Sequence, residues 1–135
     1  MSKPVFSDLF RFAGRRNRKS YALYVLSYAV IMAVLGAVVG ASAFGYGEHR
    51  LDMTATTAVW AVGGLILLAM VVSGWAVQAQ RCRDFGWTGW AILITLIPII
   101  GTIFSLAMLF IPGTLGPNRF GPDPIPNHVN DWPKD

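Results

Sequence analysis

Two arginines and an aspartate near the middle of the chain have the residue types and spacing of an anion-binding site. Arg81, Arg83 and Asp84 stand between two long uncharged stretches. On a helix the Asp84 carboxylate lies one turn from Arg81, so it can orient the guanidinium groups and leave N–H donors for a phosphate. This pattern predicts a site for a lipid headgroup or another anionic ligand. The alternative is a basic edge that sets membrane topology, where an exposed ion pair contributes under about 1 kcal/mol.

The N-terminal segment 1–20 supplies a second group of cations. It contains six Lys and Arg residues, with Arg15 and Arg16 adjacent. Pro4 suits a first helical turn, Gly14 can end a helix, and the apolar residues between them recur at helical spacing. We expect a short amphipathic helix in the membrane interface, with Arg15 and Arg16 contacting lipid phosphates. The alternative is a frayed tail.

Residues that could support catalysis or bind a metal are scarce. The two histidines, His49 and His128, are far apart, and Glu48 and Asp52 share only a short polar loop with His49. Such a loop lacks the rigid supporting shell that a metal or catalytic site needs. The single cysteine, Cys82, has no second thiol for a disulfide or a redox pair. We expect no catalytic residue, no metal site, no cofactor and no enzymatic activity.

The elements that must position these residues follow from the distribution of charge. The chain has 135 residues, is 54% hydrophobic and 13% charged, and contains three stretches without Asp, Glu, Lys or Arg. These stretches are 21–47, 53–80 and 85–118. Each exceeds the roughly 20 residues that a helix needs to cross the hydrocarbon core, and only helices are expected there. We predict an all-α integral membrane bundle of three spans, at about residues 21–44, 56–78 and 87–110.

The basic residues also predict the orientation of the chain. Six Lys and Arg residues precede the first span, one lies in the loop after it, and two lie in the next connection. Because Lys and Arg are retained in short cytoplasmic segments, we expect a cytoplasmic N-terminus. The net charge of +4 is concentrated beside an apolar stretch rather than on a folded basic face, so nucleic acid is not an expected partner.

Proline 98 makes the third apolar stretch ambiguous. It lies near the middle of the stretch, and Gly101 follows it. A proline inside a helix removes one backbone hydrogen bond and clashes with the preceding turn. We expect a Pro-kinked third span and an external C-terminus. The alternative is a re-entrant hairpin, whose halves of about 18 Å would be too short to cross and would need shielding by protein.

Small residues recur at four-residue spacing on the predicted spans, where they let another helix approach closely. The expected helix-packing face consists of Ala33, Gly36, Ala37, Gly40, Ala41, Gly101 and Ser105. Packing within one three-helix bundle would use this face internally. Self-association, or docking on a larger membrane complex, is the second use, because three spans bury only part of their surface against each other.

Three motifs occur in order along the chain: FAGRRNRKSY at 12–21, RCRDFGWTGW at 81–90 and GPNRFGPDP at 116–124. With these motifs the chain resembles, over about residues 9–124, the domain of unknown function 805 family. Ala22 and Thr88 depart from residues that are common in the family. The resemblance implies a multi-pass protein of the bacterial inner membrane, and it supplies no activity, substrate or catalytic residue.

The last motif begins an irregular Pro-rich tail. Its candidate residues are Asn118, Arg119, Phe120, Gly121, Asp123 and Pro124. Gly, Pro, Asn and Asp favour turns and extended backbone. We expect the tail to fold over the helix ends as a cap, and the alternative is a loop that binds a partner.

The domains that we predict are a basic interfacial segment (1–20), a single transmembrane domain (21–118) and the tail (119–135). Because the spans contain no ionisable acid, base or histidine, coupled transport is not expected. The first hypothesis is a non-enzymatic structural or interaction protein that packs against itself or a larger membrane complex. The alternative is binding or passive transport of a lipid or small amphiphile through the Arg81, Arg83 and Asp84 cluster. Membrane lipids are expected partners in both cases.

Overall fold

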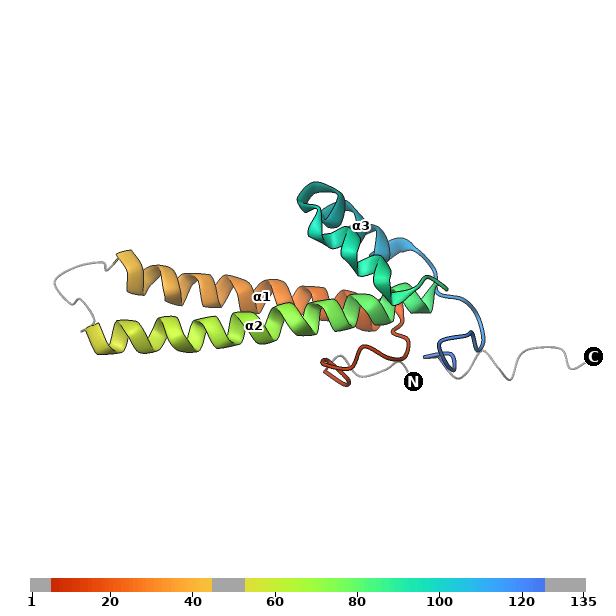
Figure 1. The fold of residues 1–135 in the computed structure, drawn as a ribbon, viewed down its shortest axis with the longest axis horizontal. Coiled ribbons are helices and arrows are strands. Elements are labelled where there is room, and N and C mark those ends of the chain that lie inside the picture. Colours follow the sequence, from red (N-terminus) through yellow and green to blue (C-terminus); the bar gives the residue numbers. More distant parts are fainter. Residues whose placement is uncertain (1–5, 45–52, 126–135) are drawn as a thin grey trace, which may run out of the picture. The chain divides into compact units, whose positions relative to one another are not determined.

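A computed structural model describes residues 6–44 and 53–125 of the chain. Over these ranges the protein is all-helical, as predicted, and the one pairing of extended backbone is an isolated bridge between Asn118 and Gly121. The helices, in chain order, are α1 (Arg18–Phe44), α2 (Met53–Asp84), the 3-10 helix η1 (Gly89–Leu96) and α3 (Pro98–Phe110) (Figure 1).

In the described ranges, α1 and α2 are the two helices long and apolar enough to cross a membrane. Asn17 caps α1, because its side-chain oxygen accepts a hydrogen bond from Ser20 N at 2.9 Å. Gly86 ends α2, because its φ of +85° turns the chain so that Trp87 N donates back to Cys82 O at 2.9 Å. Thus α2 extends beyond the predicted span and carries the two arginines near its end.

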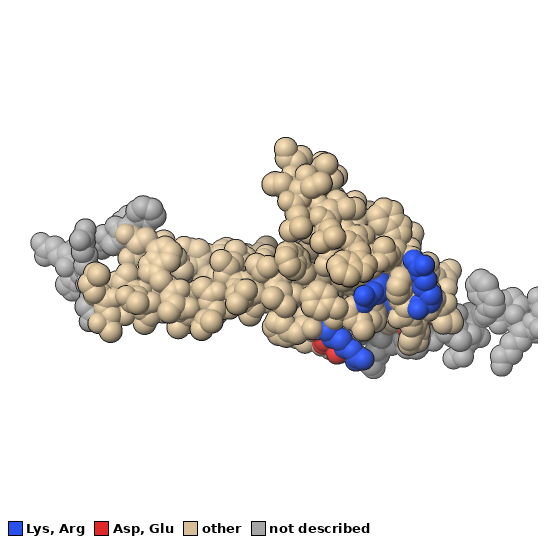
Figure 2. All heavy atoms as spheres, viewed as in Figure 1, with Lys and Arg blue, Asp and Glu red and all other residues tan. Residues whose placement is uncertain are grey.

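The chain divides into two compact units. The apolar unit is Val25–Val72, and the polar unit consists of Met1–Tyr24 and Ser73–Asp135. Every Lys, Arg, Asp and Glu of the described residues belongs to the polar unit. Accordingly, the blue and red side chains of Figure 2 belong to the polar unit alone.

In the apolar unit, α1 and α2 present many aliphatic side chains outward. Val34, Leu65 and Leu68 are each more than half exposed. The helices meet at Gly63, where an added Cβ would lie 3.2 Å from Val39 Cγ2. An aliphatic groove of about 570 Å³ also lies between them. An apolar surface of this extent suits lipid or another apolar partner rather than water.

The third apolar stretch does not form a Pro-kinked span. It consists of η1 and α3, two short helices separated by Ile97. Pro98 occupies the first position of α3, where a missing N–H breaks no helical hydrogen bond. Ile97 is extended, with φ −90° and ψ 109°, as the steric demand of a following proline favours. The helix therefore begins at the proline rather than bending around it.

The two short helices pack against each other as a hairpin (Figure 1). A Cβ at position 101 would lie 2.6 Å from both the Cα and the carbonyl oxygen of Thr95, so Gly101 permits this close approach. After the hairpin, Thr114 N donates to Asp84 O at 2.8 Å, so the chain returns to the end of α2. The predicted count of three spans is not confirmed, and the hairpin alternative describes this stretch.

Over residues 6–17, the part of it that the structure describes before α1, the N-terminal segment does not form the predicted amphipathic helix. Residues 6–10 are turns, and Asp8 has a left-handed φ of 53°, which interrupts a right-handed helix. Side chains occupy carbonyls that helical hydrogen bonds would need: Gln80 Nε2 donates to Asp8 O at 2.8 Å, and Arg16 Nη2 donates to Ser7 O at 2.6 Å. Tertiary hydrogen bonds therefore override the helical periodicity of this segment.

Candidate functional site

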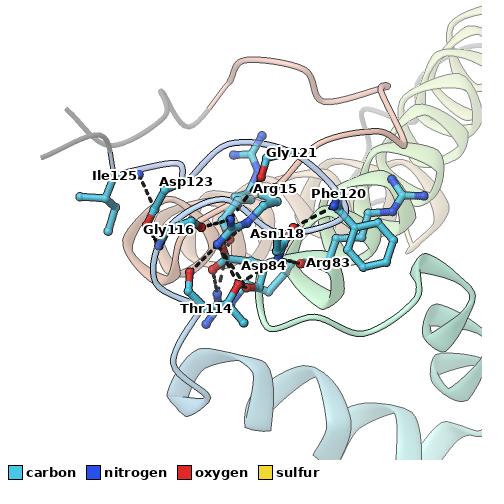
Figure 3. Close-up of polar contacts among 12 residues, drawn as sticks. Arg15, Arg83, Asp84, Thr114, Gly116, Asn118, Phe120, Gly121, Asp123 and Ile125 are labelled. Carbon is cyan, nitrogen blue, oxygen red and sulfur yellow. Dashed lines mark hydrogen bonds and ion pairs between the residues drawn. The ribbon is translucent and has the colours of Figure 1, made fainter. Parts of the chain in front are cut away.

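A buried ionic cluster, defined as Arg15, Arg81 and Asp84, lies at the end of α2. Figure 3 labels two of its members, Arg15 and Asp84. Asp84 Oδ1 accepts a hydrogen bond from Arg15 Nε at 3.2 Å and lies 3.1 Å from Arg15 Nη2. Asp84 Oδ2 pairs with Nη1 of Arg81, one turn earlier on the same helix. Asp84 is 3% exposed, Arg15 4% and Arg81 0%. Because two guanidinium groups share one carboxylate, the cluster needs further acceptors to be buried.

Arg15 finds these acceptors in the segment that follows α3. Its Nη2 donates to Thr114 O and its Nη1 to Gly116 O, both at 2.6 Å. Thr114 in turn donates to Asp84 O from its Oγ1 at 2.9 Å. One guanidinium thus links the start of α1, the end of α2 and a segment about 100 residues further along the chain.

Arg81 finds its acceptors at the end of α3. Its Nε donates to Met108 O at 3.0 Å, and its Nη2 donates to Ile111 O. The last carbonyls of a helix lack partners within the helix and carry partial negative charge, so a cation is favourable there. Gly113 lies just beyond, and an added Cβ would overlap the Asp84 carboxylate. A larger residue at position 113 would therefore have to displace the Asp84 carboxylate.

Arg16 forms a second buried group beside the ionic cluster. It is 0% exposed, and it donates from Nε to Gln80 Oε1 at 3.2 Å and from Nη1 to Ser20 Oγ at 2.8 Å. Burial lowers the pKa of the Arg16 guanidinium from its ordinary value, and the charge of Asp8 acts in the opposite direction. The hydrogen bond from Arg16 to Gln80 attaches the N-terminal segment to α2.

The tail packs on the end of α2 and on itself (Figure 3). Asn118 Nδ2 donates to Arg83 O at 2.9 Å, while the backbones of Asn118 and Gly121 exchange hydrogen bonds of 3.1 and 3.0 Å. Asp123 Oδ2 accepts from Gly116 N at 2.8 Å. The side chain of Asn118 thus connects the turn of the tail to the helix.

Phe120 of the tail lies beside two cations. The Arg83 guanidinium carbon is 5.7 Å from the centroid of the Phe120 ring, and that of Arg119 is 4.6 Å away. Arg119 Nη2 also donates to Gly86 O at 3.1 Å. Cation–π contacts of this kind each contribute about 0.5–1 kcal/mol at exposed sites. They add a second attachment of the tail to the turn that ends α2.

The structure brings together residues that the sequence places in two separate basic groups. Arg15 and Arg16 join Arg81 and Asp84 in one buried region, where their N–H groups bond to protein acceptors. Arg83 is half-buried. The lipid-headgroup role of these five residues stays a prediction.

Sequence reasoning missed three residues of this region. Gln80 and Thr114 supply acceptors to the arginines, and Gly113 leaves room for the carboxylate. A polar amide next to an arginine at the end of an apolar stretch was an available signal for Gln80. No local pattern distinguishes Thr114 or Gly113, because their role depends on side chains from another helix.

The predicted helix-packing face is divided between two environments. Its residues on α1 are Ala33, Gly36, Ala37, Gly40 and Ala41, all exposed except the half-buried Gly40. No atom lies within 4 Å of a Cβ built at Gly36 or Gly40. Gly101, by contrast, is buried in the hairpin, and Ser105 O accepts from Tyr21 Oη at 3.1 Å.

No group of three His, Cys, Asp or Glu side chains in the described parts of the chain is placed to hold a metal ion. Glu48, His49, Asp52 and His128 lie outside those parts. Cys82 is buried, with its Sγ 3.7 Å from Met108 Sδ. The described site offers ion pairs and hydrogen bonds that hold the helix ends and the tail together.

Comparison with known proteins places the chain among bacterial membrane proteins. The model of a family described as "Protein of unknown function (DUF805)" matches residues 9–122. The chain is 34% identical over 120 residues to inner membrane protein YhaH of Escherichia coli K12, covering 89% of this chain and 92% of that protein. It is 30% identical over 121 residues to inner membrane protein YhaI of the same strain, covering 89% and 91%.

A partial similarity extends to a protein named for export. The chain is 33% identical over 95 residues to the spermidine export protein MdtI of Klebsiella pneumoniae strain 342, covering 70% of this chain and 72% of that protein. No solved structure matches the chain significantly.

Proposed function

We propose that this chain, which belongs to the DUF805 family of proteins of unknown function, is a non-enzymatic inner-membrane protein that packs against other membrane helices. A second copy of the chain is the first partner to test, and a larger membrane complex is the other. The observation that carries this proposal is the exposed small-residue face of α1, with open space beside Gly36 and Gly40.

The direction of this face supports an external partner. The contact of α1 with α2 involves Leu35 and Val39, both within 4 Å of a Cβ built at Gly63. At about 100° per residue, Gly36 and Gly40 point about 100° away from that contact. Two such backbones can approach closely and gain dispersion contacts that lipid tails provide less well.

A cysteine cross-linking experiment tests this proposal in native membranes. Ala37→Cys lies on the small-residue face, and Ile31→Cys serves as the control, because Ile31 is exposed on α1 but lies about 120° from Ala37, beside the groove with α2. The native Cys82 is buried and can remain. We expect a disulfide-linked dimer with Ala37→Cys and little with Ile31→Cys. Equal cross-linking at both positions, or a monomer at every expression level, would contradict self-association through this face.

Bulk added to the face should separate the copies. Gly36→Leu with Gly40→Leu should abolish the cross-link, because two side chains would fill the space that the partner backbone needs. Gly64→Leu is the matched control, since a Cβ there also meets no atom within 4 Å but the residue lies on α2. If Gly64→Leu abolished the cross-link and the Gly36→Leu, Gly40→Leu variant did not, the contact would lie on α2, which contradicts this proposal.

We also propose that both chain ends are cytoplasmic. The N-terminal segment is rich in Lys and Arg, and two spans followed by a hairpin return the chain to the side where it began. A reporter that is active only in the cytoplasm, fused after Asp135, should be active. A reporter that is active only outside the inner membrane should be silent at the same position, and the reverse pair of results would refute this topology.

The second candidate function is binding or passive transport of a lipid or small amphiphile, and the similarity to a protein named for spermidine export favours transport. Cells that lack their own exporters and produce this chain should then tolerate more spermidine and release it faster. The matched control is the Gly36→Leu, Gly40→Leu variant, which tests whether release depends on the proposed contact. Unchanged tolerance and release at equal expression would exclude this activity for spermidine.

A further inference from the structure

A cavity of about 540 Å³ opens in the polar unit beside the ionic cluster. Four parts of the chain form its wall: the start of α1, the end of α2, the segment after α3, and the end of the described tail. Its charged lining residues are Arg18, Lys19, Asp84 and Asp123. The balance among these four side chains decides which ligand the cavity attracts.

The two cations of the cavity are available, whereas its two carboxylates are engaged. Arg18 and Lys19 are exposed, and their side chains form no ion pair or hydrogen bond with any described residue. Asp84 is paired with two arginines. The oxygens of Asp123 accept backbone hydrogen bonds of 2.8 and 2.9 Å. The cavity therefore has positive charge to offer an anion.

Apart from Asn17 and Thr114, the uncharged part of the lining is apolar. Pro112, Leu115, Pro124 and Ile125 contribute to the wall, and Leu115 is 67% exposed. Arg18 is also the first residue of α1, a candidate membrane-spanning helix. A free inorganic anion would leave the apolar wall unused, whereas a phospholipid would place its phosphate near the cations and its glycerol and first methylenes on the wall.

We propose that this cavity binds an anionic phospholipid, with Arg18 and Lys19 contacting the phosphate and Leu115 and Ile125 contacting the apolar part next to the headgroup. The site differs from the buried arginines, whose donors are bonded to protein acceptors. It does not depend on self-association, so either proposal can fail without the other.

Native mass spectrometry of the full chain in mild detergent tests this site. Dioleoyl phosphatidylglycerol is titrated against dioleoyl phosphatidylcholine, which has the same acyl chains and no net charge. Arg18→Gln with Lys19→Gln should weaken phosphatidylglycerol binding by about thirtyfold, because each cation near an anionic headgroup contributes roughly fivefold. Both side chains are exposed and unpaired among the described residues, so the variant should fold normally.

The matched control is Arg11→Gln with Arg50→Gln, which removes the same charge from two other segments of the chain and leaves the attachment of the tail intact. This control should bind phosphatidylglycerol within about threefold of the unmodified chain, because nonspecific attraction depends on overall charge. A loss as large as that of the Arg18 and Lys19 variant would show that net charge, not the cavity, holds the lipid.

Two further measurements separate a lipid site from a phosphate site. Inorganic phosphate at millimolar concentration should not displace the lipid, and Leu115→Ser should weaken lipid binding severalfold. Displacement by inorganic phosphate, equal binding of the two lipids, or full binding by the Arg18 and Lys19 variant would each overturn the proposal.

Discussion

The apolar and polar units satisfy their hydrogen bonds in different ways. In the apolar unit the helical backbone supplies its own partners, and aliphatic side chains such as Leu65 and Leu68 stay exposed. In the polar unit, residues far apart in sequence supply partners for one another, as Arg15 and Asp84 do across 69 positions. Stability in the apolar unit therefore rests on local structure, whereas stability in the polar unit rests on a few long-range contacts.

This difference predicts opposite tolerance to substitution. Contacts in the polar unit are specific and buried, so one lost partner leaves a charge unpaired. The exposed surface of the apolar unit makes few contacts that a substitution could remove. Its residues can therefore change to fit a partner. Substitutions in the two units should therefore differ in their effect on stability.

The largest effect should follow from Asp84→Asn. The substitution removes the charge shared by Arg15 and Arg81, both buried, and breaking a buried pair in this way costs about 3–5 kcal/mol. The tail should also loosen, since Arg15 holds it to the end of α2. Thermal unfolding in detergent and the rate of tryptic cleavage after Arg119 measure both effects. Unfolding and cleavage like those of the unmodified chain would show that the ionic cluster is not the main source of stability in the polar unit or of the attachment of the tail.

An intermediate effect should follow from Gly113→Ala. The added Cβ would overlap the Asp84 carboxylate, and overpacking of this kind costs about 1–3 kcal/mol. Gly64→Ala in the apolar unit is the control: its Cβ meets no atom within 4 Å, and alanine favours a helix over glycine. The midpoints of thermal unfolding should therefore shift in opposite directions. A fall of equal size in both variants would contradict the steric explanation.

The smallest effect should follow from Leu68→Ala. Leu68 is 62% exposed on α2, so its truncation leaves no buried cavity, and the free energy of unfolding should change by less than about 0.5 kcal/mol. Chemical unfolding in mixed detergent measures the change. A loss of several kcal/mol would mean that Leu68 is buried against a partner, which would itself locate an interface on α2.

Local sequence rules succeeded wherever one segment could satisfy its own backbone. The spans predicted at 21–44 and 56–78 correspond to α1 and α2, because uncharged apolar residues favour a helix whose hydrogen bonds all lie within it. The same rules were wrong for the N-terminal segment, where Gln80 and Arg16 take the carbonyls of residues that had helical periodicity.

Pro98 shows the limit of a local rule most clearly. Sequence alone left a kinked span and a hairpin open, because a proline can bend a helix or begin one. Gly101 packing against Thr95, and Arg81 bonding to Met108 O, decide for the hairpin. Neither contact is visible in the sequence, since each joins residues from different elements.

The amino-acid order alone thus determined that the chain is helical, apolar and segregated in charge, since these properties depend on neighbours within a few turns. Tertiary structure alone decided that Arg15, Arg81 and Asp84 share one buried site, and that a hairpin replaces the third span. The physical reason is that an isolated buried charge is unfavourable and must find its counter-charge, wherever in the chain that lies.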